Sequence, residues 1–252
     1  MVGSMGLTNT LSFLGLLTLA SATWLPDSRN ADAPCHKDSA VEPRAATTTM
    51  TNGSSIVCGK VGTMTWCASG ILTKGCTSST TSNCYGMYLT SNASAMLDTD
   101  HLDSPRQRNE WHFSTVASGQ SFSYSWKQYL DSTTSSNNFF HLMQVFGLSE
   151  SNPIVALDAL GGNLKIVDFS NTNKSCGSLP CPSTPLFNYF GKYTTHTISG
   201  KFGPSGSLTY VVTGPSGNII ISYTRTSGLG KDGGYIKFGT YRSVYPSMAA
   251  VK

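Results

Sequence analysis

The sequence has few charged residues and no long apolar run beyond its first two dozen residues. Charged residues make up 12% of the 252 residues, while Ser, Thr and Gly are abundant, which is more typical of an extracellular β protein than of a cytosolic helical one. No later segment is long and apolar enough to span a bilayer, and no basic run is interleaved with aromatic residues. We therefore expect neither a membrane nor a nucleic acid as partner. The net charge of +4 permits an acidic partner without requiring one.

Residues 1–22 are predicted to be a signal peptide. The stretch from Leu11 to Ala20 is apolar, and Ala20-Ser21-Ala22 fits a small-residue cleavage site, although the usual positively charged n-region is missing. A membrane anchor is the alternative, but the apolar stretch is too short to cross a bilayer. We expect the mature chain to begin near Thr23 and to be secreted. Residues 23–57 lack periodicity and are predicted to be a flexible lead-in.

Three Asn-x-Ser sequons support export. They begin at Asn52, Asn92 and Asn173 and predict N-glycosylation of a secreted chain. Such tripeptides also arise by chance, so each one alone is weak support.

Cysteine is present but fits no zinc-binding pattern. The seven cysteines are Cys35, Cys58, Cys67, Cys76, Cys84, Cys176 and Cys181. Export favours disulfides over metal ligation. Cys176 and Cys181 flank a short loop and are predicted to pair with each other. The other five leave one odd thiol, and the sequence leaves their pairing open.

The chain lacks a helix-period stretch after the signal and lacks an internal repeat. From about residue 98, strand-like runs recur between short turns rich in Gly, Pro and Asn. The runs are 108–116, 121–130, 139–146, 153–159, 164–169, 193–198, 207–213, 218–224 and 234–245. This pattern predicts an all-β sandwich or barrel, with hairpins across 160–163 and 214–217. We favour a two-sheet β-jelly roll, a concanavalin A-like sandwich with a concave substrate groove, over residues 58–252. Within that domain, residues 58–97 are Cys-rich and irregular, with some strand character around residues 56–66 and 86–91.

One strand carries four ionisable side chains. Alternation places Arg106, Arg108, Glu110 and His112 on one face. One interpretation is a solvent-exposed strand with cross-strand ion pairs. The other is an anion-binding groove, because Arg offers forked donors to a carboxylate. In that groove Glu110 would orient one guanidinium, and His112 titrates near neutrality.

A second strand, 139–146, is apolar except for Gln144 and His141. A lone polar residue in such a strand needs a partner, and Gln144 could hydrogen-bond a substrate carboxylate. Strict alternation directs His141 to the opposite face from Gln144. We therefore interpret His141 as a core histidine.

A third strand places Tyr235, Lys237, Gly239 and Tyr241 on one face. Its aromatic residues could be ordinary sheet filler. Lys237 counts against this, as does Gly239, because glycine inside a strand often marks close approach by a ligand or another backbone.

These strands supply Arg, Gln, His, Lys and Tyr but no pair of carboxylates of the kind that glycosidases need. No nucleophile elbow is visible, and no two histidines have metal-ligand spacing. The residue types favour β-elimination from a uronic acid. Neutralising the uronate carboxylate eases removal of the C5 proton. A Tyr or His can act as base and a Tyr as acid.

The segment Tyr235-Ile-Lys237-Phe-Gly239-Thr-Tyr241 resembles the Tyr-x-Lys-x-Gly-x-Tyr strand of jelly-roll alginate lyases. That resemblance implies that Tyr241 is the catalytic acid/base. The Arg106–Glu110 strand is similar to an Arg/Glu-rich strand of the same family.

Gln144 takes the glutamine position of the family's Gln-x-His strand, where Phe146 replaces the histidine. The stretch 105–245 resembles more closely the fungal glucuronan lyases of polysaccharide lyase family 20. Members use a Gln and a Tyr with a His nearby, and His112 could supply that imidazole from a neighbouring strand.

The resemblance implies a secreted lyase that cleaves glucuronan or an alginate-like polymer, its acidic polysaccharide partner, and we expect a monomer. The implied catalytic residues are Tyr241, His112 and Gln144. The implied substrate-binding residues are Arg106, Arg108, Glu110, Lys237 and Tyr235. No cofactor is expected to be required, although related jelly rolls hold a structural calcium, for which Asp98, Asp100 and Asp103 are the candidate carboxylates. The alternative is a non-catalytic carbohydrate-binding protein of the same fold.

Overall fold

The computed structural model describes residues 47–76, 83–134, 136–170, 176 and 179–252. The chain divides into two compact units, residues 1–42 and 43–252, and all the described residues belong to the second. The predicted signal peptide, most of the predicted lead-in, Cys35 and the sequon at Asn173 lie outside the described residues.

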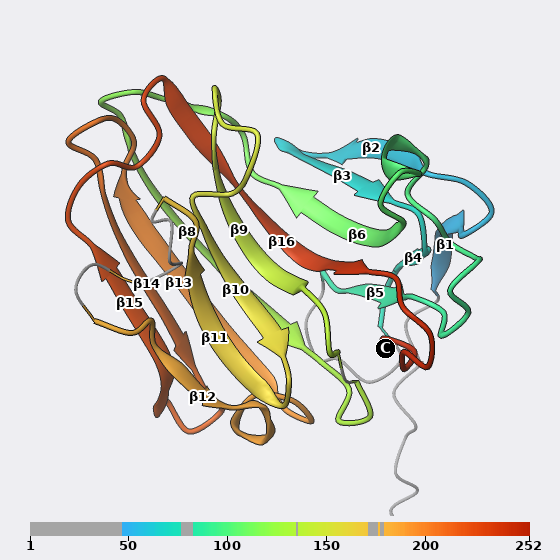
Figure 1. Cartoon of the computed structure of the whole chain (residues 1–252). Coiled ribbons are helices and arrows are strands. Elements are labelled where there is room, and N and C mark those ends of the chain that lie inside the picture. Colours follow the sequence, from blue (N-terminus) through green and yellow to red (C-terminus); the bar gives the residue numbers. More distant parts are fainter. Residues whose placement is uncertain (1–46, 77–82, 135, 171–175, 177–178) are drawn as a thin grey trace, which may run out of the picture. The chain divides into compact units, whose positions relative to one another are not determined.

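Two antiparallel sheets lie face to face and form the sandwich (Figure 1). Within the described residues the large sheet has nine strands. In spatial order they are β12 (Ser183–Pro185), β11 (Asn163–Asp168), β10 (Val155–Leu160), β9 (Phe140–Gly147), β16 (Gly233–Ser243), β6 (Arg106–His112), β3 (Met64–Ala68) and β2 (Val57–Val61), with β7 (Val116–Ala117) paired to β16. The smaller sheet, in the same part of the chain, has the order β15 (Ile219–Arg225), β14 (Ser207–Thr213), β13 (Tyr193–Lys201) and β8 (Ser121–Tyr129). The predicted all-β jelly roll is confirmed.

A third, small sheet is made of β1 (Thr48–Asn52), β4 (Ile71–Lys74) and β5 (Tyr85–Tyr88). Helical structure in the described ranges is limited to two 3₁₀ turns, η1 (Thr99–His101) and η2 (Leu186–Asn188). Neither is long and apolar enough to cross a membrane.

The core lies between the two main sheets, because inward-facing side chains alternate with outward-facing ones along each strand. In β8, for example, Phe122 and Trp126 are buried while Ser123 and Lys127 are exposed. Burial of the inward apolar side chains contributes most of the driving force for folding, at roughly 25 cal/mol per Å² removed from water.

The structure differs from the sequence prediction at the N-terminal side of the domain. Residues 48–52 fall in the predicted flexible lead-in but form β1, which pairs with β4. The Cys-rich segment predicted to be irregular supplies β2 and β3, which extend the large sheet beyond β6. The strand character predicted around residues 56–66 and 86–91 corresponds to β2, β3 and β5, whereas β1 and the pairing of β3 with β6 are not predicted by the local pattern.

Both predicted hairpins are confirmed. Strands β10 and β11 pair across Gly161-Gly162, a two-residue turn in which both glycines have positive φ (59° and 76°), as a type I′ turn requires. Strands β14 and β15 pair across residues 214–218.

A β-bulge in β9 changes which side chains share a face. Met143 lies opposite Leu157 of β10, but the next pair is His141 with Asp158, so Leu142 is an extra residue. Leu142 and Met143 both lie in the core cluster between the sheets. His141 and Gln144 therefore lie on the same, outer face, and the prediction that they face opposite ways is wrong.

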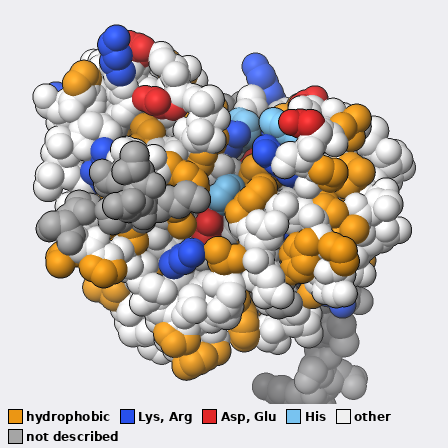
Figure 2. Space-filling model, in the orientation of Figure 1, with side chains coloured by type: hydrophobic (Ala, Val, Ile, Leu, Met, Phe, Trp, Pro, Cys, Tyr) orange, Lys and Arg blue, Asp and Glu red, His pale blue; other side chains and the backbone are white. Residues whose placement is uncertain are grey.

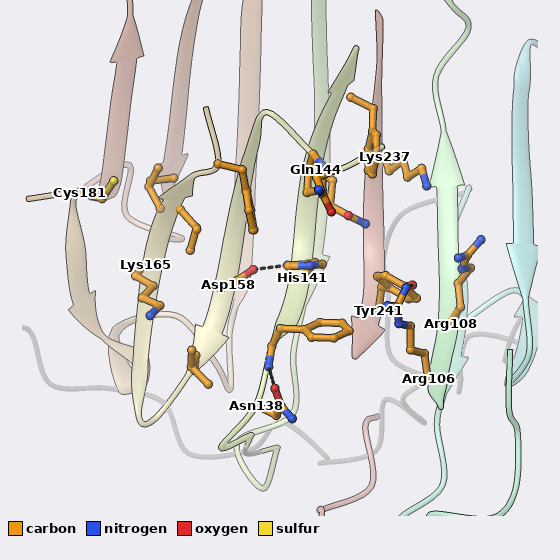
Figure 3. Close-up of a pocket in the computed structure, with 18 of the residues that line it drawn as sticks. Arg106, Arg108, Asn138, His141, Gln144, Asp158, Lys165, Cys181, Lys237 and Tyr241 are labelled. Atoms are coloured by element: carbon orange, nitrogen blue, oxygen red, sulfur yellow. Dashed lines mark hydrogen bonds and ion pairs between the residues drawn. The ribbon is translucent and has the colours of Figure 1, made fainter. Parts of the chain in front are cut away.

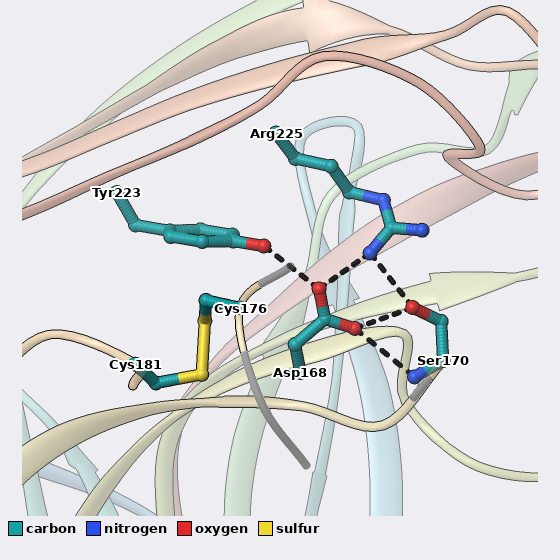
Figure 4. The surroundings of a disulfide bond; sticks show 6 residues. All are labelled: Asp168, Ser170, Cys176, Cys181, Tyr223 and Arg225. Carbon is teal, nitrogen blue, oxygen red and sulfur yellow. Dashed lines mark hydrogen bonds and ion pairs between the residues drawn. A yellow bond between two sulfur atoms is a disulfide. The ribbon is translucent and has the colours of Figure 1, made fainter. Parts of the chain in front are cut away.

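Disulfides and one polar cluster tie the sandwich together. The predicted Cys176–Cys181 bond is present, and Cys58–Cys67 and Cys76–Cys84 are bonded as well. Near Cys176–Cys181, the buried Asp168 of β11 accepts a hydrogen bond from the Tyr223 hydroxyl of β15 at 2.7 Å and pairs with Arg225 of the same strand (Figure 4). This cluster links the two sheets through charged and polar groups.

Candidate functional site

A groove of about 800 Å³ runs across the outer face of the large sheet. Figure 2 shows this face hollowed, with Lys, Arg and His side chains along the hollow. Among the described residues that line it, the cationic side chains are Arg106, Arg108, Lys165 and Lys237, and the single carboxylate is Asp158. Such a balance favours an anionic ligand through electrostatic attraction.

Tyr241 lines the groove and is in contact with two guanidinium groups. Arg106 Nη1 donates a hydrogen bond to the Tyr241 hydroxyl at 2.7 Å. The guanidinium carbon of Arg108, which lies opposite Tyr241 in the adjacent strand, is 4.7 Å from the centre of the phenol ring. Tyr241 is only 7% exposed, so its ring is fixed and its hydroxyl is the group presented to the groove (Figure 3).

A chain of buried polar contacts fixes Gln144 and Arg108. The Gln144 side-chain amide donates to the Glu110 carboxylate, whose other oxygen lies 3.5 Å from Arg108 Nε. Arg108 Nη2 also lies 2.8 Å from Asp98 Oδ2. Burial alone would lower the pKa of Arg108, but the carboxylates of Glu110 and Asp98 outweigh it and raise the pKa. Strand β6 is therefore a buried, charged strand of the groove floor, and the interpretation as a solvent-exposed strand is wrong.

Lys237 lies directly opposite Gln144 in the sheet. Its ammonium nitrogen is 4.5 Å from the centre of the Phe146 ring, and the residue is 9% exposed. Burial lowers its pKa, and the carboxylate of Glu110 partly offsets this effect. Lys237 and Gln144 together offer an ammonium and an amide to one point in the groove.

His141 lines the groove, and the prediction that it is a core histidine is wrong. Its Nδ1 forms a short hydrogen bond with the carboxylate of Asp158, and both residues are buried. The imidazole lies between Asp158 and Tyr241 (Figure 3), with its ring centre 5.9 Å from that of Tyr241. Asp158 and Lys165 also line the groove, although the sequence alone did not predict them as site residues. The presence of two polar residues, His141 and Gln144, in an otherwise apolar strand could have indicated that His141 is functional. Only the bulge, however, brings the two to one face.

His112 shares the groove face but lies far from Tyr241. Arg108 is opposite Tyr241, and His112 is four residues further along β6, about 13 Å at the usual rise of a strand. His112 and Tyr235 line a separate hollow, and their ring centres are 5.8 Å apart. Burial, with the nearby charges of Lys237 and Arg108, lowers the pKa of His112 to about 3. The structure therefore places Gln144, Tyr241, Arg106, Arg108 and Lys237 in one groove. His112 and Tyr235 lie beside Lys237 but away from Tyr241.

The candidate calcium ligands do not form a cation site. Asp98 is fully buried and its carboxylate is committed to Arg108 and to the backbone amide of Asp100. No cluster of three or more metal-ligating side chains occurs among the described residues. The donor set therefore does not fit a structural calcium at Asp98, Asp100 and Asp103.

The two described sequons are sterically open. Asn52 and Asn92 are both exposed, and each side-chain oxygen accepts a hydrogen bond from the backbone amide two residues later. Glycosylation at Asn52 and Asn92 stays a prediction.

No protein-family model matches the chain, and no curated protein matches it. Solved structures with a similar arrangement include a family 7 alginate lyase in complex with substrate, at 14% identity and a TM-score of 0.44 over 66% of this chain and 72% of that chain. Another alginate lyase of polysaccharide lyase family 7 has 12% identity and a TM-score of 0.40 over 79% of this chain and 78% of that chain. The CBM2 module of a Lactobacillus casei phage protein has 10% identity and a TM-score of 0.37 over 57% of this chain and 66% of that chain. These likenesses are too distant to assign an activity.

Proposed function

We propose that the chain is a secreted polysaccharide lyase that cleaves a uronic-acid polymer, glucuronan or an alginate-like chain, by β-elimination. The observation that carries the proposal is the meeting of Tyr241, a carboxylate-paired His141, and the donors of Gln144 and Lys237 in one cationic groove. The three disulfides among the described residues support secretion. We expect the enzyme to act as a monomer and to require no cofactor.

The first requirement of the reaction is neutralisation of the uronate carboxylate. Lys237 and Gln144 lie opposite each other, and Arg108 lies on the neighbouring strand, held by Glu110 and Asp98. These donors are fixed before substrate binds, so they need little reorganisation when charge develops on the carboxylate as the C5 proton leaves.

The second requirement is a base and an acid on either side of the sugar. Because Asp158 accepts the Nδ1 proton of His141, the Nε2 lone pair is free to remove the C5 proton. The electron pair forms the C4–C5 double bond, and the C4–O bond to the leaving sugar breaks. Tyr241 donates its proton to that oxygen, while the guanidinium of Arg106 stabilises the negative charge that develops on the phenol oxygen. His112 takes no part in these steps.

Hydrolysis fits the groove less well. A retaining glycosidase needs two carboxyl groups about 5–5.5 Å apart across the bond. Of the described residues that line the groove only Asp158 has a carboxylate, and it is bound to His141.

The proposal is tested by incubating the purified protein with glucuronan and with alginate and following the ultraviolet absorbance of unsaturated uronates. Tyr241→Phe and His141→Asn should each lower kcat by about 100-fold or more, the usual contribution of a positioned acid or base. Tyr129→Phe is the matched control, since Tyr129 is an exposed tyrosine of the smaller sheet.

Two results would count against the lyase, and a third against the proposed role of Tyr241. No absorbance rise on any uronan, combined with tight binding of these polymers, would indicate the non-catalytic binding protein. Saturated products would indicate a hydrolase. Full activity of Tyr241→Phe would remove the proposed acid even if the reaction class stood.

A further inference from the structure

A row of side chains crosses five strands of the large sheet on the groove face. Its members are Lys60 of β2, Thr65 of β3, His112 of β6, Lys237 of β16 and Gln144 of β9, each directly opposite the next. Directly opposite residues of an antiparallel sheet point to the same face. The row therefore runs perpendicular to the strands for about 19 Å, four strand spacings of about 4.8 Å.

The far end of the row opens into a second hollow of about 440 Å³. Its polar lining includes Lys60, Thr65, His112 and Tyr235. Lys60 is exposed, and no ion pair to it occurs within the described part of the chain. The hollow therefore offers an available ammonium group.

Aromatic rings connect the hollow with the groove. The rings of His112 and Tyr235 stack, and Tyr235 stacks in turn on Phe146 at 5.7 Å and 6°. Phe146 lines the groove beside Lys237. The surface between Lys60 and Lys237 is thus lined by aromatic side chains, as ligand sites commonly are.

The outer wall of the hollow is firmly held. Strands β2 and β3 form a hairpin in which Cys58 and Cys67 lie opposite each other and are joined by a disulfide. The Ser114 hydroxyl donates to the Thr63 carbonyl at 2.9 Å, which ties the hairpin turn to the segment after β6. The position of Lys60's strand is therefore set before a ligand arrives.

We propose that this hollow is a distal subsite that binds the carboxylate of a second uronate, through Lys60, several sugar units from the bond that is cleaved. The inference rests on the proposed function, because a polyuronate presents a carboxylate on every sugar and would place one at each end of the row. It implies that the enzyme cleaves within long chains and prefers polymers to short oligosaccharides.

The test is Lys60→Gln, assayed on glucuronan, on alginate, and on size-defined oligosaccharides of both. The variant should lower kcat/KM on the polymer about two- to five-fold more than on the shortest oligosaccharide that is cleaved, mainly through KM, as expected for one solvent-accessible ion pair. The effect should shrink at high salt. Lys127→Gln, on the exposed face of the smaller sheet, is the control and should match the unaltered chain. Calorimetric binding of long oligosaccharides to the Tyr241→Phe variant, with and without Lys60→Gln, gives a readout independent of turnover.

The outcomes separate the subsite from the activity. If the protein cleaves uronans and Lys60→Gln behaves as Lys127→Gln does, the subsite is refuted and the lyase stands. If no uronan is cleaved but long oligosaccharides bind in a Lys60-dependent manner, the subsite stands and the lyase is refuted. Absence of both cleavage and binding overturns both proposals.

Discussion

Replacing Gly239 by alanine should both destabilise the fold and disturb the groove. Gly239 lies in the middle of β16 with φ at +135°, a conformation that residues with a side chain rarely adopt. A Cβ atom there would stand 2.3 Å from the Asn109 carbonyl oxygen and 3.1 Å from the Glu110 Cα. Both atoms belong to β6, which is paired on its other edge with β3, so β6 has little room to retreat.

The expected cost has two parts. Backbone strain at a sparsely populated φ costs about 1–3 kcal/mol, and overpacking against a fixed strand adds about 1–3 kcal/mol. The variant Gly217→Ala separates the strain from the overpacking. Gly217 has φ at +79°, but a Cβ atom added there would have nothing within 4 Å. We expect Gly239→Ala to lower the free energy of unfolding by about 1–3 kcal/mol more than Gly217→Ala.

Urea unfolding followed by tryptophan fluorescence measures this difference, since Trp126 packs against Phe238 next to the substituted residue. Activity should fall by more than the folded fraction does, because Gly239 lies opposite Glu110, which holds Gln144. Equal unfolding midpoints for Gly239→Ala and Gly217→Ala would refute the argument that close backbone approach requires this glycine.

Three further perturbations test other parts of the structure. Burial lowers the pKa of His196 from 6.5 to about 3. Between these pH values the unfolded chain binds more protons than the folded chain, so the free energy of unfolding should fall as pH decreases through this window. His196→Gln should make that fall smaller, as measured by urea unfolding at pH 7 and at pH 4. The double variant Cys58→Ser with Cys67→Ser should lower the free energy of unfolding by about 2–3 kcal/mol, the loop-closure contribution of a short disulfide loop. It should also reduce the effect of Lys60→Gln on kcat/KM for the polymer. Asp168→Asn should lower the free energy of unfolding by about 3–5 kcal/mol in the same assay, because it breaks the buried charged link between the sheets. Asp103→Asn, at an exposed residue, should leave the free energy of unfolding almost unchanged.

Much of the sandwich was predictable because its strands are regular and their turns are short. The pair Gly161-Gly162 marks a two-residue hairpin by its composition, and the alternation in residues 121–129 assigns the inward face without knowledge of the partner strand. Period-2 burial and turn chemistry are local properties, so sequence patterns carry them directly.

The place of the edge strands in the sheet and the bulge were not predictable, because they depend on partners outside the local pattern. Strand character around residues 56–66 is visible in the sequence, but β3 joins the large sheet by pairing with β6, some forty residues further along the chain, and β2 joins it through β3. The bulge at Leu142 adds one residue to β9 without altering its apolar composition. Strict alternation then assigns His141 to the wrong face, although it assigns Gln144, Lys237 and Tyr241 correctly.

The two histidines on the groove face, His141 and His112, differ in their electrostatic surroundings. This difference assigns separate roles to the two ends of the face. Asp158 contacts Nδ1 of His141 and would stabilise the cation that forms when Nε2 takes up a proton. His112 has no carboxylate partner among the described residues, and its Nε2 is buried without a hydrogen bond. Burial and the charge of Lys237 lower its pKa to about 3, so protonation there is unfavourable at neutral pH. Proton transfer therefore belongs at the end of the face where Asp158 lies, while the neutral ring of His112 is suited to stacking and contact with sugar at the other end.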